Sequence, residues 1–251
     1  MFDLTGKTAI VTGGSRGIGK AACISLAAYG AKVVVTGVSD GNQATADEIR
    51  KTGGEAIFVR CDVSKPEQSE TAVRKSVEAF GGVDILVNNA GVAAVDPAED
   101  VTEEEWDRVM AVNLRGLFFM SQAAAKAMIQ RKKGGRIINI GSIFGRVGSE
   151  MGASVYHASK GGIVVLTRAL ACEWAKYCIL VNAIGPGFIK TEMTKSIEEA
   201  PELYNLLKDR HALKRFGTPD EIAGAIIYFA SEASRFVTGQ NLYVDGGYTA
   251  W

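Results

Sequence analysis

Short runs of β-branched apolar residues alternate with amphipathic segments from one end of the chain to the other. The first segments are Thr8–Val11, Ile18–Tyr29, Lys32–Val35 and Asn42–Lys51, which indicate strand, helix, strand and helix in turn. Strands that are apolar along their whole length and are separated by helices are typical of βαβ units. The alternation therefore predicts an α/β fold in which helices cover both faces of a parallel sheet.

The same rhythm continues to the end of the chain and predicts seven strands. The remaining five are Ala56–Arg60, Ile85–Asn88, Arg136–Gly141, Leu180–Ile184 and Asn241–Val244. Glycine pairs mark several joins, and no Pro- or Ser-rich stretch is long enough to be a linker. A length of 251 residues suits one large domain. We therefore expect a single domain over residues 1–251.

Composition and charge exclude several classes of partner. Lys and Arg together number 28, as do Asp and Glu, so no net field attracts nucleic acid or an anionic membrane. No uninterrupted apolar stretch is long enough to span a bilayer, and a strand-like run begins within a few residues of Met1, which leaves no room for a signal sequence. We expect a cytoplasmic protein. The four cysteines show no metal-binding or redox spacing: Cys23, Cys61, Cys172 and Cys178.

One helix start is well marked in the sequence. Thr102 is followed three residues later by Glu105, which is the pattern of a capping box, in which each side chain binds the backbone amide of the other residue. The pattern predicts a helix that runs through Trp106 and Val109 toward Asn113.

A glycine-rich turn follows the first predicted strand and leads directly into an amphipathic helix. It resembles a dinucleotide fingerprint with unusually wide glycine spacing, and its candidate cofactor-binding residues are Gly13, Ser15, Arg16, Gly17, Ile18 and Gly19. A turn without side chains lets a pyrophosphate approach backbone amides at a helix N-terminus, and Gly19 would let helix and strand pack closely. The alternative is a tight βα connection that needs glycine for steric reasons alone.

Tyr156 and Lys160 are four residues apart, a helical spacing that places phenol and ammonium on one face. A nearby cation lowers the pKa of a tyrosine and suits it to exchange a proton with an alcohol. Ser142, at the end of a predicted strand, could hold the substrate oxygen. The alternative for Tyr156 and Lys160 is a chance pair on an exposed helix face.

Asn113 is a poor residue for the interior of an apolar helix, because its amide competes for backbone hydrogen bonds. Two interpretations stay open, and both can be true. In one, a kink at Asn113 frees a carbonyl to bind water; in the other, Asn113 caps a second helix that begins at Leu114.

These motifs resemble, in order and interval, those of the short-chain dehydrogenase/reductase family, and the resemblance covers essentially the whole chain. It implies a Rossmann-type doubly wound sheet. It also implies a catalytic tetrad of Asn113, Ser142, Tyr156 and Lys160. By that resemblance Tyr156 exchanges the substrate proton, and Lys160 lowers the pKa of Tyr156 and binds the nicotinamide ribose. Ser142 polarises the substrate carbonyl, and Asn113 anchors a water that relays protons to Lys160.

The resemblance also implies further contacts with the cofactor. Asp62 and Val63 match an adenine-contacting pair, and Asn89 is expected to be mainly structural, bonding neighbouring strands. The other implied cofactor-binding residues, besides Tyr156 and Lys160, are Ala90, Gly91, Pro186, Gly187, Ile189 and Thr191. A mobile substrate lid is implied over about residues 190–212.

The end of the second strand bears on the choice of cofactor. Gly37 stands where NAD-selective relatives have an aspartate, and Arg16, Thr36 and Ser39 could bind a 2′-phosphate. We therefore expect NADP(H). NAD(H) or the use of both cofactors is the alternative, because Val38 stands where many NADP-selective members have an arginine and Asp40 would repel the 2′-phosphate.

Apolar residues dominate the expected substrate pocket, which favours a neutral, moderately hydrophobic ketone or alcohol. The expected contacts, besides Ser142 and Tyr156, are Val92 to Val95, Ile143, Phe144, Met151, Phe188, Met193 and Ile197. Several of these could instead pack the lid onto the sheet. The favoured function is an NAD(P)-dependent ketone or 3-oxoacyl reductase, and the alternative is a sugar, polyol or small-alcohol dehydrogenase. A non-catalytic nucleotide sensor is the contrasting hypothesis.

Expected partners follow from the same resemblance. A homotetramer is expected through helices containing Asn113–Gln130 and Ser154–Trp174, with Trp251 near an interface. An acidic acyl carrier protein could dock on Arg131, Lys132 and Lys133 near the active-site mouth, although Lys176-Tyr177-Cys178 lacks the basic residue and glycine usual in such reductases. We expect surface roles for His157 and His211.

Overall fold

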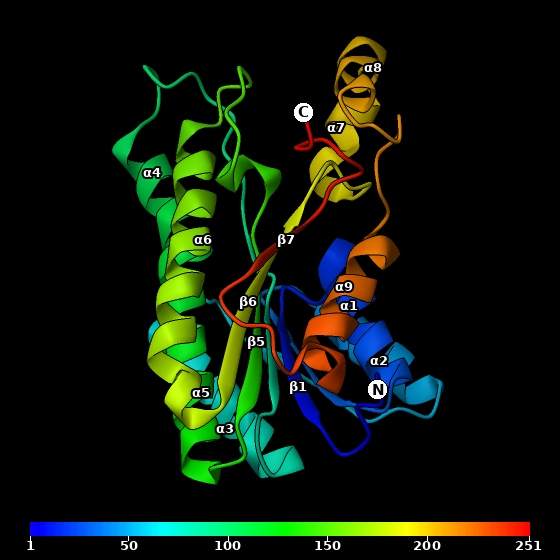
Figure 1. The fold of residues 1–251 in the computed structure, drawn as a ribbon, viewed down its shortest axis with the longest axis vertical. Coiled ribbons are helices and arrows are strands. Elements are labelled where there is room, and N and C mark those ends of the chain that lie inside the picture. Colours follow the sequence, from blue (N-terminus) through cyan, green and yellow to red (C-terminus); the bar gives the residue numbers. More distant parts are fainter.

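Seven parallel strands form one sheet in the computed structural model, which describes residues 1–251. The strand order is β3-β2-β1-β4-β5-β6-β7 (Figure 1). The strands are β1 (Thr8–Thr12), β2 (Lys32–Gly37), β3 (Ala56–Arg60), β4 (Ile85–Asn88), β5 (Gly135–Ile140), β6 (Ile179–Pro186) and β7 (Asn241–Val244). The predicted doubly wound α/β fold is confirmed, and three strands have the predicted bounds.

Helices cover both faces of the sheet, and a hydrophobic cluster lies beneath each layer. One layer holds α1 (Gly17–Ala28), α2 (Gly41–Lys51) and α9 (Pro219–Ala230). The other holds α3 (Pro66–Phe80), α5 (Leu117–Arg131) and α6 (Ser154–Trp174), as Figure 1 shows. The shorter helices are α4 (Glu103–Met110), α7 (Lys195–Glu198) and α8 (Pro201–Asp209). None of the helices combines the length and the apolar character needed to cross a membrane.

The predicted capping box at Thr102 is only half formed. The Thr102 hydroxyl accepts a hydrogen bond from the Glu105 amide at 3.2 Å, and α4 begins at the next residue. The Glu105 carboxylate does not return to Thr102 but binds the Arg108 guanidinium at 2.7 and 2.8 Å. A charged partner one turn later therefore outcompetes the backbone amide.

The basic residues considered for carrier docking lie at the wrong edge of the sheet. Arg131 ends α5, and Lys132 and Lys133 lead into the amino end of β5, whereas Ser142 follows its carboxyl end. Arg131 also pairs with Asp84 at 3.0 Å. The expected place of these residues near the active-site mouth was therefore wrong.

Candidate active site

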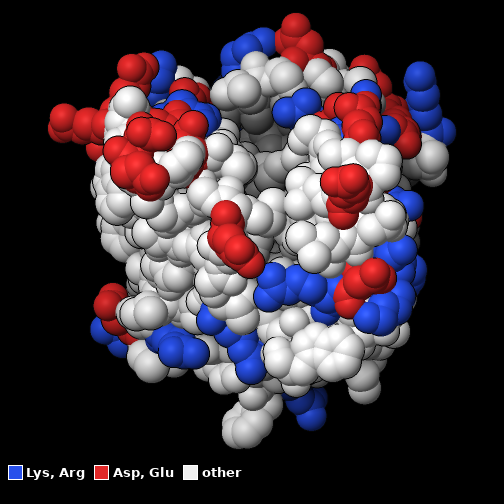
Figure 2. Space-filling view, turned by 90° about the horizontal axis from the view of Figure 1, so that it is seen from above, with Lys and Arg blue, Asp and Glu red and all other residues white.

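The loops that follow β1, β4, β5 and β6 meet at the carboxyl edge of the sheet, at the top of Figure 1. The strand order reverses between β1 and β4, and such a switch point opens a crevice in which ligands bind. Figure 2, viewed from above this edge, shows the surface hollowed there. The predicted site residues are distributed around this hollow.

The turn between β1 and α1 needs its glycines. Gly13 and Gly17 have φ values of +67° and +52°, in the left-handed region that favours glycine. A Cβ at Gly19 would lie 2.1 Å from the Gly13 carbonyl oxygen, so helix and strand approach as closely as predicted. Arg16 precedes α1 and forms no side-chain cap, which leaves the first amides of the helix free for an anion.

Asn89 and Thr12 join β4 to β1 beneath this turn. The Asn89 amide group donates to the Thr12 and Gly13 carbonyls at 2.9 and 3.1 Å, as the expected structural role requires. The Thr12 hydroxyl accepts from the Asn89 and Ala90 amides, both at 2.9 Å. Thr12 was not predicted from the sequence; its signal was a hydroxyl residue at the end of the apolar run Ala9–Val11.

The end of β2 has no room for an acidic side chain without rearrangement. A Cβ at Gly37 would lie 2.6 Å from the Asn42 side chain, which donates to the Ser39 carbonyl at 2.7 Å. Thr36 is fully buried, and its hydroxyl donates to the Val11 carbonyl at 3.2 Å, so that hydroxyl faces the sheet rather than the crevice.

Asp40, which was expected to repel a 2′-phosphate, is paired in the structure. Its carboxylate binds the Arg60 guanidinium at 2.6 Å, and the same guanidinium donates to the Val38 carbonyl at 2.5 Å. Both partners of the ion pair are largely exposed. Arg60 therefore offsets the charge of Asp40 beside the end of β2.

Asn113 lies in a π-helical segment, Ala111–Gly116, that joins α4 to α5 without a break. Its Oδ1 accepts from the Val92 amide at 2.8 Å, and its Nδ2 donates to the Val92 carbonyl at 2.9 Å and to the Ser159 hydroxyl at 3.1 Å. The alternative that Asn113 caps a new helix was wrong, because the chain stays helical through it. The π-helix is the distortion that the kink hypothesis anticipated.

Ser142, Tyr156 and Lys160 come together from the end of β5 and the first turns of α6. The Lys160 Nζ lies 5.5 Å from the centre of the Tyr156 ring and donates to the Ile140 carbonyl at 2.8 Å. Lys160 is buried, and Tyr156 is half-buried. Gly91 connects this group to Asn113, because an ideal Cβ at Gly91 would lie 3.8 Å from the Lys160 Nζ and 3.4 Å from the Asn113 Oδ1. All four residues of the expected tetrad therefore border one small region.

Burial sets the pKa values of the two central groups. Desolvation raises the pKa of the Tyr156 phenol to about 12, against the opposing effect of a hydrogen bond with Ser142. Desolvation lowers the pKa of the Lys160 ammonium to about 8. In the chain without a dinucleotide the cost of burying a phenolate therefore dominates the pKa of Tyr156. The prediction that the Lys160 ammonium and a nicotinamide positive charge together lower this pKa concerns the cofactor-bound protein and stays a prediction.

The segment after β6 covers the N-terminus of α1. Ile189 bridges to Gly217, and Thr191 packs its methyl group over Gly17, where a Cβ would lie 3.1 Å from it. A hollow of about 790 Å³ lies between this segment and α1. Its basic lining residues are Arg16, Lys20, Lys190 and Lys195.

Asp62 and Val63 follow β3 on the other side of the crevice. The Asp62 Oδ1 accepts from the amide and hydroxyl of Ser64 at 3.0 and 2.7 Å, which fixes the turn. The Val63 carbonyl lies against the π-helix, where a Cβ at Gly116 would lie 2.7 Å from it. Gly187 lies similarly close to Asp245, with 2.8 Å between its ideal Cβ and the Asp245 Cα.

Phe188 belongs to a buried aromatic cluster and packs the segment after β6, as the alternative interpretation anticipated. Its ring stacks on Phe216 at 5.3 Å and lies 5.9 Å from His211. His211 is 1% exposed and its Nδ1 bonds the Leu207 carbonyl at 2.8 Å, so the expected surface role was wrong. Burial also lowers the pKa of His211. Met193, in contrast, is 54% exposed.

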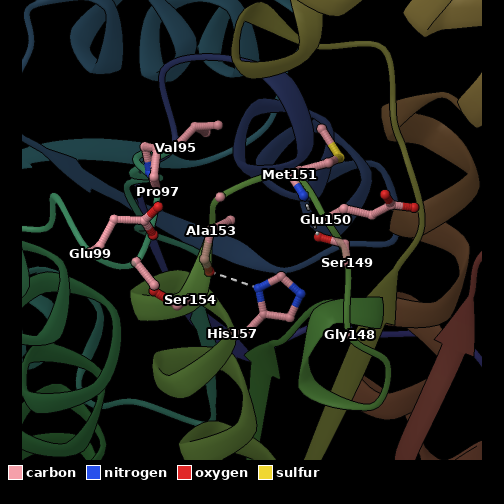
Figure 3. Close-up of a pocket in the computed structure, with 12 residues that line it drawn as sticks. Val95, Pro97, Glu99, Gly148, Ser149, Glu150, Met151, Ala153, Ser154 and His157 are labelled. Atoms are coloured by element: carbon pink, nitrogen blue, oxygen red, sulfur yellow. Dashed lines mark hydrogen bonds between the residues drawn. The ribbon is translucent and has the colours of Figure 1, made fainter.

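A pocket of about 620 Å³ opens beside α6, between the loop after β4 and the loop before α6 (Figure 3). Its lining combines four hydrophobic residues with the polar side chains of Glu99, Ser149, Glu150, Ser154 and His157. His157 lines it, stacked on Phe144 at 4.4 Å between ring centres. His157 therefore belongs to a cavity wall and not to an ordinary surface face.

Comparisons with known proteins agree with this geometry. A family model described as enoyl-(acyl carrier protein) reductase matches residues 13–249. A galactitol 2-dehydrogenase (L-tagatose-forming) of Cereibacter sphaeroides is 42% identical over 254 residues, which cover 100% of this chain and 98% of that protein.

Two solved structures have nearly the same fold. A short-chain type dehydrogenase/reductase from Mycobacterium marinum is 40% identical with a TM-score of 0.95, and the match covers 100% of this chain and 98% of that one. A gluconate 5-dehydrogenase from Burkholderia cenocepacia, in complex with NADP and tartrate, is 37% identical with a TM-score of 0.95 and the same coverage. The chain belongs to the short-chain dehydrogenase/reductase family and is an NAD(P)-dependent oxidoreductase.

Proposed function

We propose that the chain interconverts a ketone and a secondary alcohol with NADP(H), and that Tyr156 is its proton donor and acceptor. The observation that carries the proposal is the convergence of Ser142, Tyr156 and buried Lys160 at the carboxyl edge of the sheet. A bound nicotinamide dinucleotide supplies the hydride in reduction and accepts it in oxidation. The reduction consumes one proton, which the protein delivers.

Each residue of the tetrad has a stated role in the proposal. Tyr156 donates its phenolic proton to the carbonyl oxygen, and Ser142 donates a hydrogen bond to the same oxygen. Lys160 stabilises the phenolate by its charge and binds the ribose of the dinucleotide. Asn113 holds the loop after β4 through Val92, and the π-helix offers a backbone carbonyl for a relay water.

The cradle between β1 and α1 fits a dinucleotide pyrophosphate. Its left-handed glycines keep the backbone bare, and the uncapped amides of α1 point into the crevice. Asp62, Val63 and the Asn89-Ala90-Gly91 segment are proposed for the adenosine side. Pro186, Gly187, Ile189 and Thr191 are proposed for the nicotinamide side.

The preference for NADP(H) rests on charge at the end of β2. Gly37 brings no carboxylate, Arg60 offsets Asp40, and exposed Arg16 is available for a 2′-phosphate. Ser39 remains in the proposed set, whereas the Thr36 hydroxyl is already used within the sheet. The relative from B. cenocepacia binds NADP, which supports the same choice.

Further parts of the proposal concern assembly and the lid. Residues 190–212 are proposed as the lid, because α7 and α8 rise above the carboxyl edge of the sheet in Figure 1. Exposed Ala158, Val165 and Ala169 on α6 support the homotetramer. The cytoplasm is the proposed location on the family resemblance. A carrier-protein partner is not part of the proposal, because its expected basic residues lie at the opposite edge.

Deuterium transfer tests the proposed function directly. The protein is mixed with NADPH deuterated at C4 and, in turn, with ketones, ketoses and 3-oxoacyl thioesters, and the product is examined by mass spectrometry. We expect deuterium on the former carbonyl carbon of at least one substrate, and a higher kcat/KM with NADPH than with NADH. If no ketone is reduced and no secondary alcohol is oxidised in reverse, the proposed reaction is wrong.

A further inference from the structure

The pocket of about 620 Å³ beside α6 is the feature that the proposed chemistry leaves unexplained. One of its lining residues, His157, directly follows the proposed catalytic Tyr156 in the chain. Phe144 stacks on His157, which lines the pocket, and meets the Tyr156 ring edge-on at 6.3 Å. Gly152 lies against the backbone of Asp96, with 3.1 Å between its ideal Cβ and the Asp96 carbonyl carbon, so the two loops meet. His157, the residue after Tyr156, therefore brings the wall of the pocket to within one aromatic ring, that of Phe144, of the proposed catalytic phenol.

The side chains that line the pocket offer mainly hydrogen-bond acceptors. Glu99 and Glu150 both line the space, and neither takes part in an ion pair. In Figure 3 the Glu99 carboxylate points toward the other lining residues, whereas the Glu150 side chain extends away from them. Ser149 and Ser154 add hydroxyls that can donate or accept, and no lysine or arginine lines the pocket.

His157 adds one more acceptor. Its Nδ1 bonds the Ala153 carbonyl at 2.7 Å, and because a carbonyl only accepts, Nδ1 must carry the ring proton. Nε2 of the neutral ring is then an acceptor, and it is buried without a partner. A buried acceptor without a donor is costly, so a rotation of the ring that exposes Nε2 to a ligand hydroxyl in the pocket would be favoured.

The approach to the pocket is acidic as well. The segment from Asp96 to Asp107 contains seven acidic residues and no basic residue. Figure 2 shows acidic side chains gathered on the α4 side of the hollow. This field disfavours carboxylates, phosphates and an acidic carrier protein, although salt weakens it.

We propose that the physiological substrate is a polyol or the matching ketose, rich in hydroxyl donors and without negative charge. The proposal rests on the proposed function and specifies its substrate class. In the oxidative direction a secondary alcohol loses a hydride to NADP⁺ and its hydroxyl proton to Tyr156, which gives the ketone, NADPH and one proton. Glu99, Glu150 and His157 bind the hydroxyls away from the reacting carbon and select against anions.

Sorbitol and gluconate test the proposal, because they share one carbon skeleton and differ only in a terminal CH₂OH or carboxylate group. Binding is measured by calorimetry on the Tyr156→Phe variant saturated with NADP⁺, so that no turnover is required, and kcat/KM is measured on the wild type. We expect sorbitol to bind at least about tenfold more tightly, on the basis of two nearby like charges.

Charge-removing variants identify the cause of the preference. Glu150→Gln and Glu99→Gln should each narrow the ratio of the two dissociation constants about threefold, mainly by improving gluconate binding. Glu103→Gln, in the same acidic segment but outside the pocket lining, is the matched control and should narrow the ratio less than either lining variant, because it removes only a charge of the surrounding field.

Three results would overturn the substrate class: equal or tighter binding of gluconate, no binding of either compound, or a ratio that Glu99→Gln and Glu150→Gln do not alter. These outcomes can be distinguished from failure in the deuterium experiment. If the enzyme reduces another ketone or a 3-oxoacyl thioester, the proposed function holds and only the inferred substrate class is wrong.

Discussion

At the scale of single residues, Tyr156 and Lys160 are buried in a way that disfavours their charged forms. The pKa of Tyr156 is raised to about 12 and that of Lys160 is lowered to about 8, both chiefly by desolvation. A buried ammonium without a carboxylate partner reduces the stability of the fold. Such a cost at a crevice is typical of a functional site, where a group is kept for its chemistry.

Lys160→Met should therefore raise stability while it abolishes activity. Below pH 8 the wild-type ammonium is charged in both states, and removing it should gain roughly 2–3 kcal/mol in the free energy of unfolding. As the pH rises from about 8 to 10.5, only the unfolded chain still binds this proton, so wild-type stability rises and the gain disappears. Turnover should fall at least about 100-fold.

Guanidinium denaturation at pH 7 and pH 10.5 measures this difference, with exposed Lys176→Met as the control. A Lys160→Met protein that is less stable at pH 7, or equally shifted at both pH values, would show that burial is not the dominant effect on Lys160.

At the scale of elements, the β1–α1 unit and the π-helix position the site. Gly19 lets α1 pack directly on the end of β1, and Asn89 ties that end to β4. The π-helix turns Asn113 toward Val92, so that the loop after β4 is held by two backbone hydrogen bonds. The dinucleotide cradle and the proposed proton-transfer residues are thereby built on rigid elements.

Gly19→Ala tests the close approach of α1 to β1. The added methyl would lie 2.1 Å from the Gly13 oxygen and 2.4 Å from the Asn89 Nδ2, so the turn must shift. We expect a loss of about 1–3 kcal/mol in stability and at least tenfold weaker NADPH binding by fluorescence titration. Gly224 lies in α9, with no neighbouring atom within 4 Å of its ideal Cβ. The control Gly224→Ala should therefore bind NADPH normally and gain up to about 1 kcal/mol in the free energy of unfolding. Normal binding by Gly19→Ala would contradict the account.

The alternation of apolar runs with amphipathic segments was sufficient to predict the strands of the sheet, because runs such as Ala56–Arg60 are local signals. The helical spacing of Tyr156 and Lys160 is also a local signal, whereas their grouping with Ser142 was implied by the family resemblance. The burial of His211 and Phe188 depends on contacts with distant Phe216 and is not encoded locally. The raised pKa of Tyr156 in the chain without a dinucleotide is likewise not encoded locally, since desolvation depends on the whole surrounding structure.

At the scale of the whole molecule, the exposed face of α6 is the proposed assembly surface. Val165 is 65% exposed at the middle of this helix, and Gly161 one turn earlier has no neighbouring atom within 4 Å of its ideal Cβ. An open apolar face on a long helix suits close packing against a second copy of the chain.

Light scattering at micromolar concentration should give a mass near four times 26.7 kDa for the wild type. Val165→Lys should shift the protein to smaller species, because it places a charge in a desolvated contact. Leu206→Lys, equally exposed on α8, should remain tetrameric. A stable wild-type monomer would refute the proposed assembly.

The central claim is that the Tyr156 phenol carries the substrate proton, and Tyr156→Phe tests it most directly. Steady-state reduction and NADPH binding are measured on wild type, Tyr156→Phe and exposed Tyr177→Phe. We predict that Tyr156→Phe binds NADPH within about twofold of wild type and loses at least about 100-fold in kcat, while Tyr177→Phe retains both properties. A Tyr156→Phe protein that reduces ketones at the wild-type rate would contradict the account.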